Sequence, residues 1–364
     1  MGAIKKTIYS VSVSVSVSIF LWGTGLFINI ADAEDLFTLY NYQYNLKPGV
    51  TIKKPIISYE QDISTSTNIR VSFTRDDVDL EKSSVDSVSG ASKLASGAEV
   101  WDDTRNEFTV SATQSLGDYK IEGGYYHSRE TDYLSQTPSL SISRDFLNRN
   151  TTIKLGFSHS FDQTFGHYMG ISKDKDTDNL GLSLTQVFTP TTLGQIGYTY
   201  SSVRGYMPSG NRKVTITGSS TPSDEYMPDS RKREGAGLRV AQYLPINSSI
   251  HLSYRWYRDT WSINSDTASA QFFQYLLPNI IARLEYRTYR QSGAFFYKSI
   301  YSGAEDFLTS TNIYAPFDSR LLGAKLSYQT SGKLKWRFSG LYERYTQSVG
   351  LEGDIYMVNV GLMF

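Results

Sequence analysis

The final eleven residues of the chain, 354–364, alternate between two kinds of side chain. Because successive side chains of a β-strand point to opposite faces, this alternation predicts a strand with two chemically different faces. The mixed face carries Met357, Asn359 and Gly361. A strand with one apolar face needs an apolar environment on that side, either a protein core or lipid. The apolar face carries Tyr356, Val358, Val360, Leu362 and Phe364.

The first 33 residues have the pattern of a secretory signal peptide. Lys5 and Lys6 supply a positive start, residues 19–30 an apolar core, and residues 31–33 a small-x-small cleavage site. The alternative is an uncleaved helical anchor, although the apolar core is shorter than the roughly 20 residues that a spanning helix needs. We therefore expect a signal peptide at 1–33 and one mature domain at 34–364.

Composition narrows the class of protein without deciding it. The chain is 14% aromatic, yet its mean hydropathy is only −0.34. Alternating faces cancel on average, so this pairing suits a membrane barrel as well as a soluble β-sandwich. The 36 basic and 36 acidic residues balance, which gives no indication of nucleic acid as a partner. Cysteine is absent, so the chain has no disulfide, no thiol nucleophile and no haem-attachment motif, and no cofactor is predicted.

Clusters of Gly, Pro, Asn and Ser divide the mature domain and predict tight turns between antiparallel strands. Seven clusters are present, at residues 64–68, 117–118, 148–150, 190–192, 245–248, 278–279 and 331–332. Longer polar stretches alternate with them, at about residues 80–104, 163–178, 205–233 and 293–316. This asymmetry is typical of outer-membrane barrels, which have short periplasmic turns and long external loops.

Seven turns join fourteen strands, and further strands are predicted at residues 36–44 and 354–364. The predicted fold is therefore all-β, a transmembrane antiparallel up-and-down barrel of sixteen strands, with fourteen as the alternative. A soluble sandwich shows the same alternation with its apolar face buried. The strand number and the signal peptide favour the barrel. Phe364 also favours it, because an aromatic last residue resembles the terminal signature of bacterial outer-membrane barrel proteins.

An Arg or Lys facing lipid near the midplane costs about 2–4 kcal/mol, so charged strand residues are expected to face the lumen. Alternation places five acidic residues inward: Glu107, Glu122, Asp145, Glu285 and Glu343. It places ten basic residues inward: Arg70, Lys120, Lys154, Arg239, Arg255, Arg283, Arg287, Lys325, Lys335 and Arg337. These ten, together with Glu285, are the predicted channel lining.

Five segments together resemble a family of bacterial outer-membrane barrels that is catalogued only as a domain of unknown function. They are residues 85–92, 128–133, 150–152, 254–263 and 286–297. The sequence departs from the family pattern at Lys93, where proline is expected, and at Ser262, where glycine is expected. The resemblance implies the fold and an outer-membrane location, and it implies no activity.

The predicted function is a porin-like channel for small anionic solutes. A sixteen-stranded barrel leaves room for an aqueous channel, and rings of Arg and Lys favour anions. One alternative is that the inward charges form cross-strand ion pairs that stiffen the wall, such as those of Arg283 and Arg287 near Glu285. Another is a scaffold barrel that sheaths a partner, for example a periplasmic redox protein. The other expected partners are outer-membrane lipid and the barrel-assembly machinery, the latter through the strand that ends at Phe364.

No enzymatic activity is predicted. Residues 127–128 and 159–160 each place histidine beside serine, as an outer-membrane lipid hydrolase would need, but neighbouring strand residues point to opposite faces. Residues 174–179 have the spacing of the first ligands of a calcium loop. That segment lacks the glycine at position six and the glutamate at position twelve, where Thr185 stands. A solvated external loop is expected there, and no metal.

Overall fold

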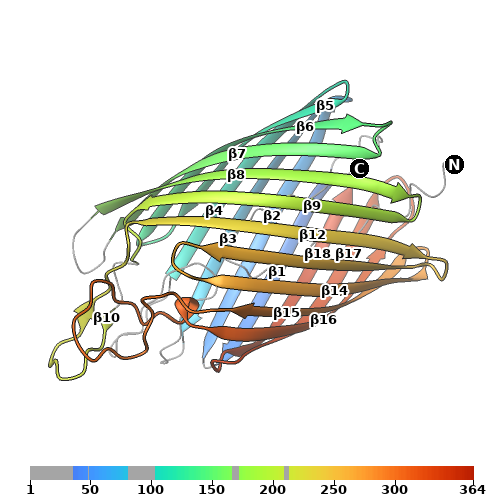
Figure 1. Ribbon diagram of the computed structural model, residues 1–364. Helices are drawn as coiled ribbons and strands as arrows, with labels where there is room; N and C mark the ends of the chain where they lie inside the picture. The colour runs from blue at the N-terminus through green and yellow to red at the C-terminus, as the bar shows by residue number, and fades with distance from the viewer. Residues whose placement is uncertain (1–35, 48, 81–102, 166–171, 209–212) are drawn as a thin grey trace.

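The computed structural model describes residues 36–47, 49–80, 103–165, 172–208 and 213–364 (Figure 1). Sixteen antiparallel strands form a closed barrel, which confirms the predicted fold and strand number. Each barrel strand pairs with its neighbours in chain order, and β18 pairs with β1, with Leu36 opposite Met363. The barrel strands are β1 (Leu36–Lys47), β2 (Val50–Ser64), β3 (Thr67–Leu80), β4 (Asp103–Leu116), β5 (Tyr119–Arg129), β6 (Tyr133–Phe146), β7 (Thr151–Phe165), β8 (Ser172–Thr189), β9 (Thr192–Gly205), β12 (Ser230–Leu244), β13 (Ser248–Asp259), β14 (Asn264–Leu277), β15 (Ile280–Gln291), β16 (Phe317–Gln329), β17 (Lys335–Gln347) and β18 (Glu352–Met363).

The seven predicted turns all connect consecutive strands at one end of the barrel, and the longer connections lie at the other end (Figure 1). One loop prediction was too long. Residues 172–178 belong to β8, and they pair with the end of β7, with Phe165 opposite Ser172. The solvated loop predicted at 174–179 is therefore wrong. The polar character of this segment comes instead from aspartates on the outer face of the strand, where Asp178 pairs with Arg204.

The outer face of the barrel carries a continuous apolar band. On β16, Leu322 and Leu326 are exposed, whereas Leu321 and Lys325 on the alternate face are buried. Toward the long-loop end the band gives way to tyrosines such as Tyr254 and Tyr342, and then to charged residues. A closed barrel with an apolar outer band and an aromatic girdle satisfies every requirement of a lipid environment. Among the described residues, no helix is long and apolar enough to cross a membrane.

Part of the inner face is apolar as well. An inner apolar cluster forms where β1 and β2 meet β16–β18, and Tyr42, Ile52 and Met357 are at most 2% exposed within it. The rings of Tyr40, Tyr42 and Tyr44 stack along β1 with centroids 6.2 Å apart. The outer face of β1 therefore exposes apolar groups and its inner face buries them. The inner face is closed to water at the level of the inner apolar cluster.

Two long loops fold together into a cap at the long-loop end, which we define as residues 206–208, 213–229 and 292–316. The cap contains β10 (Lys213–Val214), β11 (Ser223–Asp224) and a 3-10 helix, η1 (Asn312–Tyr314). Isolated bridges join the loops at Ile216 and Tyr301, and at Tyr226 and Leu308. Figure 1 shows the two loops side by side beyond the strand ends. The predicted signal peptide at 1–33 lies outside the described residues.

Candidate functional site in the barrel lumen

All eleven predicted lining residues lie on the inner face of the strands. The register shows this directly, because Arg283 is opposite Lys325, Arg239 is opposite Ser253, and Arg337 is opposite Gly361. The apolar residues between them point outward and are exposed, as at Leu238, Leu284 and Leu326. The placement is thus as expected. That these side chains line a conducting channel stays a prediction.

The predicted two-to-one excess of inward basic residues is wrong, because sequence reasoning missed charged residues near the strand ends. Among the strand residues whose side chains the structure describes, together with Glu130 of the short β5–β6 connection, sixteen basic and eleven acidic residues lie on the inner side. The missed basic residues are Lys54, Arg105, Lys173, Lys175, Arg231 and Arg233. The missed acidic ones are Glu60, Asp62, Asp76, Glu130, Asp162 and Asp259. Their register partners reveal them, as where Asp76 lies opposite Arg105.

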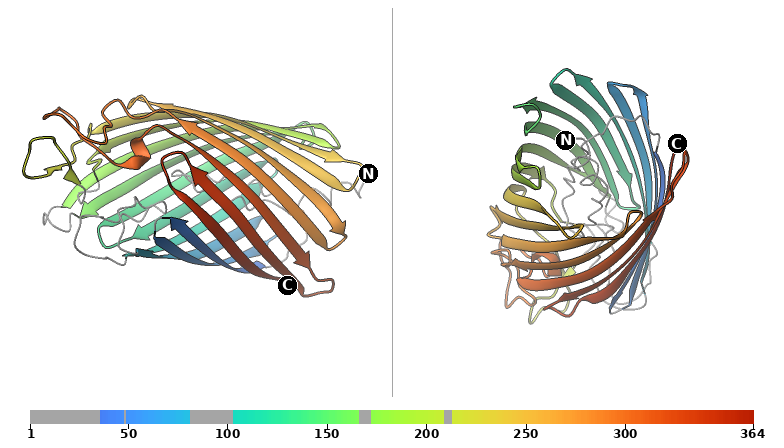
Figure 2. Two further views of the ribbon diagram at one scale, coloured as in Figure 1. Left: turned by 90° about the horizontal axis from the view of Figure 1, so that it is seen from below. Right: turned by 90° about the vertical axis from the view of Figure 1, so that its right-hand side faces the viewer.

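The inward charges are segregated between two walls. The acidic wall, which we define as β1–β8 with the β5–β6 connection, carries seven of these basic residues and eight of the acidic ones. The basic wall, β9 and β12–β18, carries nine basic residues and three acidic ones. Figure 2 looks along the barrel in its right-hand view, where β1–β8 (blue to green) lie across the lumen from β13–β18 (orange to red). The field inside the barrel is therefore directed across it.

Several charges of the basic wall are buried in an ion-pair network. Arg283, which is 3% exposed, lies 3.3 Å from Glu285 and 3.4 Å from Glu343. Gln271 donates a hydrogen bond of 2.9 Å to Glu285. The side chain of Glu343 reaches this network across β16 because Gly323 lies between Glu285 and Glu343 in the register. A Cβ on Gly323 would come within 2.8 Å of the Glu343 Cγ. At Arg283 the structure therefore agrees with the alternative of cross-strand ion pairs rather than with an arginine that faces water.

Other arginines of the same wall face the lumen. Arg239 is exposed, and Arg255 and Arg287 are half-buried. The Arg255 guanidinium lies 5.8 Å from the ring of Tyr257 and extends over Gly235 on the neighbouring strand. Among the described residues, no carboxylate lies within 4 Å of the Arg239 or Arg255 guanidinium nitrogens. These two charges are therefore available to solutes.

The acidic wall has its own buried network near the long-loop end. Asp76 is fully buried and pairs with Arg105 and with Lys54, the latter at 3.3 Å. Arg105 also contacts Glu107 at 3.3 Å, and Tyr126 donates a hydrogen bond of 2.6 Å to Glu107. Acids and bases alternate in space here, so the network holds four adjacent strands together and leaves little net charge.

Nearer the short turns, the acidic wall carries more open pairs. Lys154 lies 3.0 Å from Glu122 and Arg70 lies 2.8 Å from Glu60, with every one of these side chains partly exposed. Exposed pairs of this kind contribute roughly 0–1 kcal/mol to stability. Lys120 and Asp145 lie at the same end of the barrel, within a few residues of the turns. Lys335 and Arg337 occupy the corresponding level of the basic wall.

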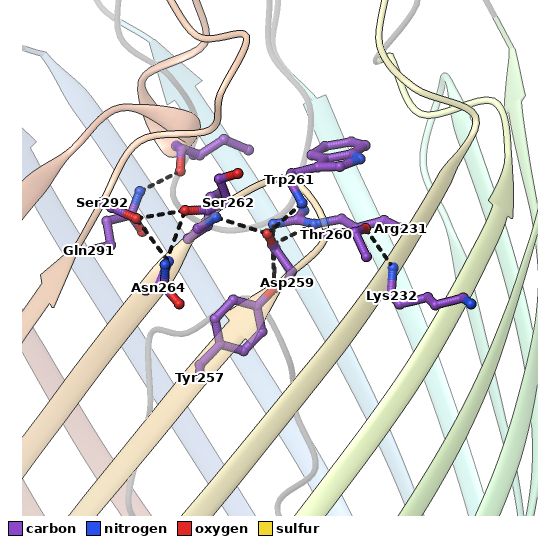
Figure 3. Close-up of polar contacts among 12 residues, drawn as sticks. Arg231, Lys232, Tyr257, Asp259, Thr260, Trp261, Ser262, Asn264, Gln291 and Ser292 are labelled. Carbon is purple, nitrogen blue, oxygen red and sulfur yellow. Dashed lines mark hydrogen bonds and ion pairs between the residues drawn. The ribbon is translucent and has the colours of Figure 1, made fainter.

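The barrel rim beneath the cap is held together by Asp259 (Figure 3). The carboxylate of Asp259 accepts hydrogen bonds from the backbone N–H groups of Trp261 and Ile263, from the Tyr257 hydroxyl at 2.7 Å and from Arg231 Nε at 2.8 Å. The Arg231 guanidinium also stacks on the Trp261 ring at 4.4 Å. The segment 254–263, one of the five that carry the family resemblance, thus has a structural role at the external rim.

Ser262 explains one departure from the family pattern. Its φ angle is 67°, in the left-handed region that favours glycine. The turn has this conformation because residues on both sides of Ser262 bind the same Asp259 carboxylate, and the Ser262 carbonyl accepts a hydrogen bond of 2.9 Å from Ser292. Glycine would suit the position for that reason.

The cap is fixed internally by buried polar contacts. Glu225 accepts hydrogen bonds from the hydroxyls of Thr309, at 2.6 Å, and Thr311, at 2.7 Å. The Tyr301 hydroxyl is buried, accepts a bond from the Thr309 N–H at 2.8 Å and donates to the Phe296 carbonyl. Burial raises the pKa of Tyr301 above its ordinary value, so the phenol stays a donor. Each contact joins residues of the two loops or fixes one loop onto itself.

The histidine–serine doublets point to opposite faces, as strand alternation requires. Ser128 is buried on the inner side, and the inward Ser160 accepts a hydrogen bond of 2.8 Å from Thr137. His159 points outward and lies 2.7 Å from Asp178. Among the described residues, no three or more His, Cys, Asp or Glu side chains are grouped to hold a metal ion.

The comparison with family models identifies one family along almost the whole chain. The model described as "Protein of unknown function (DUF3570)" matches residues 31–168 and 165–361. The chain belongs to this family. No curated protein matches it. Membership confirms the resemblance carried by the five segments and assigns no activity.

Solved structures share the fold at very low sequence identity. A bacterial polysaccharide outer-membrane secretin matches with a TM-score of 0.51 and 8% identity, over 92% of this chain and 100% of that one. OmpT of Vibrio cholerae, with loop L8 deleted, matches with a TM-score of 0.48 and 8% identity, over 92% and 100%. OpdK of Pseudomonas aeruginosa with vanillate matches with a TM-score of 0.45 and 9% identity, over 92% and 98%. These likenesses concern the fold alone.

The closed barrel and its apolar outer band place this DUF3570 protein in the bacterial outer membrane. The polysaccharide outer-membrane secretin shares the architecture. A channel-like role is consistent with a barrel of this size.

Proposed function

We propose that the protein is a passive, porin-like channel for small anionic solutes. The observation that carries the proposal is the charge of the basic wall. This wall carries nine inward basic residues and only three inward acidic ones. Three of the basic residues, Arg239, Arg255 and Arg287, are open to the lumen. A low-dielectric wall focuses such a field and raises the local concentration of counter-ions.

The buried network of Arg283 does not oppose this function, because it contributes structure rather than selectivity. Arg283 is neutralised by Glu285 and Glu343, so its charge adds little to the field in the lumen. Selectivity should therefore depend on the three open arginines and should change little when a charge on the outer face is removed.

Conductance in a planar bilayer tests the proposal. Purified mature protein, checked for folding by its heat-modifiable migration in gels, is reconstituted under a KCl gradient. We expect stable single-channel conductance steps and a reversal potential close to the chloride equilibrium potential. Replacing Arg239, Arg255 and Arg287 together by glutamine should shift the reversal potential toward the potassium equilibrium potential.

Arg258→Gln is the matched control. Arg258 lies on the same strand as Arg255 but points outward, where it pairs with Glu234. Its replacement should leave the reversal potential unchanged. A cation-selective parent protein would contradict the proposal. Silence from a folded barrel would also contradict it, and would favour the scaffold that encloses a partner.

A further inference from the structure

Across the lumen from the ion-pair network of Arg283, the inner face of the barrel is lined with hydroxyl groups. On β6, every inward residue over a run of nine is a serine or threonine: Ser135, Thr137, Ser139, Ser141 and Ser143. The outward residues between them include Leu140 and Ile142, which are exposed. Hydroxyls are both donors and acceptors, so such a surface binds polyhydroxylated molecules well.

The same surface has little side-chain volume. In one continuous row of the register, Ser141 is opposite Gly156, Gly156 is opposite Gly181, and Gly181 is opposite Thr199. The row continues from Thr199 to Gly235 on β12. A Cβ on Gly181 would meet no atom within 4 Å. We name these five residues the small-residue row, which is open to the lumen at Gly181.

An arginine and a hydroxyl meet at the end of this row. Around the position that a Cβ on Gly235 would take, Thr199 Oγ1 lies at 3.0 Å and Arg255 Nε at 3.7 Å. The hydroxyl and the guanidinium therefore lie close to one another beside Gly235. Arg239 lies on the same strand as Gly235 and faces the same side. The anion-binding groups of the basic wall thus adjoin the hydroxyl surface directly.

A buried hydroxyl beside the row lacks a partner. Ser201 is 8% exposed, faces inward one inward position beyond Thr199 on β9, and its Oγ has no hydrogen-bond partner among the described residues. A buried unpaired hydroxyl costs free energy in the empty protein. A ligand hydroxyl would remove that cost, which is an observation independent of the small-residue row.

We propose that the lumen binds anionic, polyhydroxylated solutes of the sugar-acid class. The acid group binds Arg255 and Arg239, and the hydroxyls of the solute bind Thr199 and Ser201. This inference rests on the proposed channel and names its substrate class. A guanidinium forms the strong, charge-assisted bonds to a carboxylate, and the neutral hydroxyl bonds add smaller increments.

Three probes of similar size separate the two kinds of recognition. Gluconate has the carboxylate and the hydroxyls, hexanoate has only the carboxylate, and sorbitol has only the hydroxyls. Binding to the folded protein in detergent is measured by calorimetry, and block of the current is measured in the bilayer. We expect gluconate to bind about ten-fold more tightly than either of the other probes.

Variants assign the contacts. Arg255→Gln should weaken gluconate toward the affinity of sorbitol, and Thr199→Val should reduce its advantage over hexanoate. Arg258→Gln, on the outer face, should change neither. Equal binding of gluconate and hexanoate would overturn the inference, because the hydroxyl surface would then contribute nothing.

The two measurements also separate this inference from the proposed function. Gluconate binding without conductance would support the site and overturn the channel. Conductance without any preference for gluconate would support the channel and overturn the site.

Discussion

Two glycines on the inner face show how differently the two sides of this barrel are used. Gly181 on β8 faces open space, whereas the corresponding space at Gly323 on β16 is filled by Glu343. At β8 the missing side chain widens the lumen. At β16 it admits a carboxylate that neutralises Arg283. The same residue type thus leaves open space on one side of the barrel and makes room for a buried ion pair on the other.

The comparison extends to charge. Near Gly323 the ionic groups are buried and paired, and the inner apolar cluster lies close by on β16–β18 and β1. Near Gly181 the neighbours are hydroxyls, and the nearest arginines are open. A barrel wall of this kind combines a rigid side with a side that is free to interact with solutes.

The largest expected effect comes from breaking the rigid side. Glu343→Ala removes one of two carboxylates from the buried Arg283 and should lower the free energy of unfolding by about 3–5 kcal/mol. Glu122→Ala, which removes the partly exposed partner of Lys154, should cost no more than about 1 kcal/mol. Urea titration of both variants in lipid vesicles measures the difference. Equal losses would show that the two sides do not differ in this respect.

A smaller effect is expected from the glycines themselves. Gly323→Ala forces the Glu343 side chain to move and should destabilise the barrel by about 1–3 kcal/mol. Gly181→Ala should change the free energy of unfolding by less than about 0.5 kcal/mol, because its Cβ would meet only open space. The same urea titration compares them. A cost at Gly181 as large as that at Gly323 would mean that the β8 side is filled as well.

The smallest difference between paired variants is expected at the external rim. Ser262→Gly should stabilise the protein by about 1 kcal/mol, because glycine adopts the positive φ angle without strain. Ser262→Ala should bring no such gain, since alanine keeps the strain. Both are measured by thermal unfolding in detergent. A gain with alanine as large as that with glycine would assign the effect to the lost hydroxyl.

The architecture was predictable from the sequence because its signals are local. Turn clusters such as residues 117–118 and 278–279, with period-two alternation between them, define each strand without reference to distant residues. The boundary of β8 was predicted less well, since the outward aspartates at 174–178 resemble a polar loop. Only the pairing of Asp178 with Arg204 and His159 shows that these aspartates lie on the outer face of a strand, beyond the apolar band.

The division between open and buried charges was not predictable. Arg283 and Arg255 look alike in sequence, each being an inward arginine in a strand with alternating polarity. What separates them is Glu343, which lies two strands from Arg283 and reaches it across Gly323. The inner apolar residues Tyr42 and Tyr44 were missed for a related reason. Both faces of β1 carry apolar groups, so alternation alone does not show that the inner one is buried.

The cap gives the outer rim a behaviour that separate loops would lack. Its two segments are joined by the Glu225 carboxylate and by the backbone of Tyr301, and Asp259 binds Trp261 and Arg231 in the rim beneath them. Such contacts make the two loops a single cooperative unit for local opening. Amide exchange in both loops should therefore slow or quicken together. Outside the cell, an antibody or a protease would encounter one folded surface, whose recognition depends on residues some eighty positions apart in the chain.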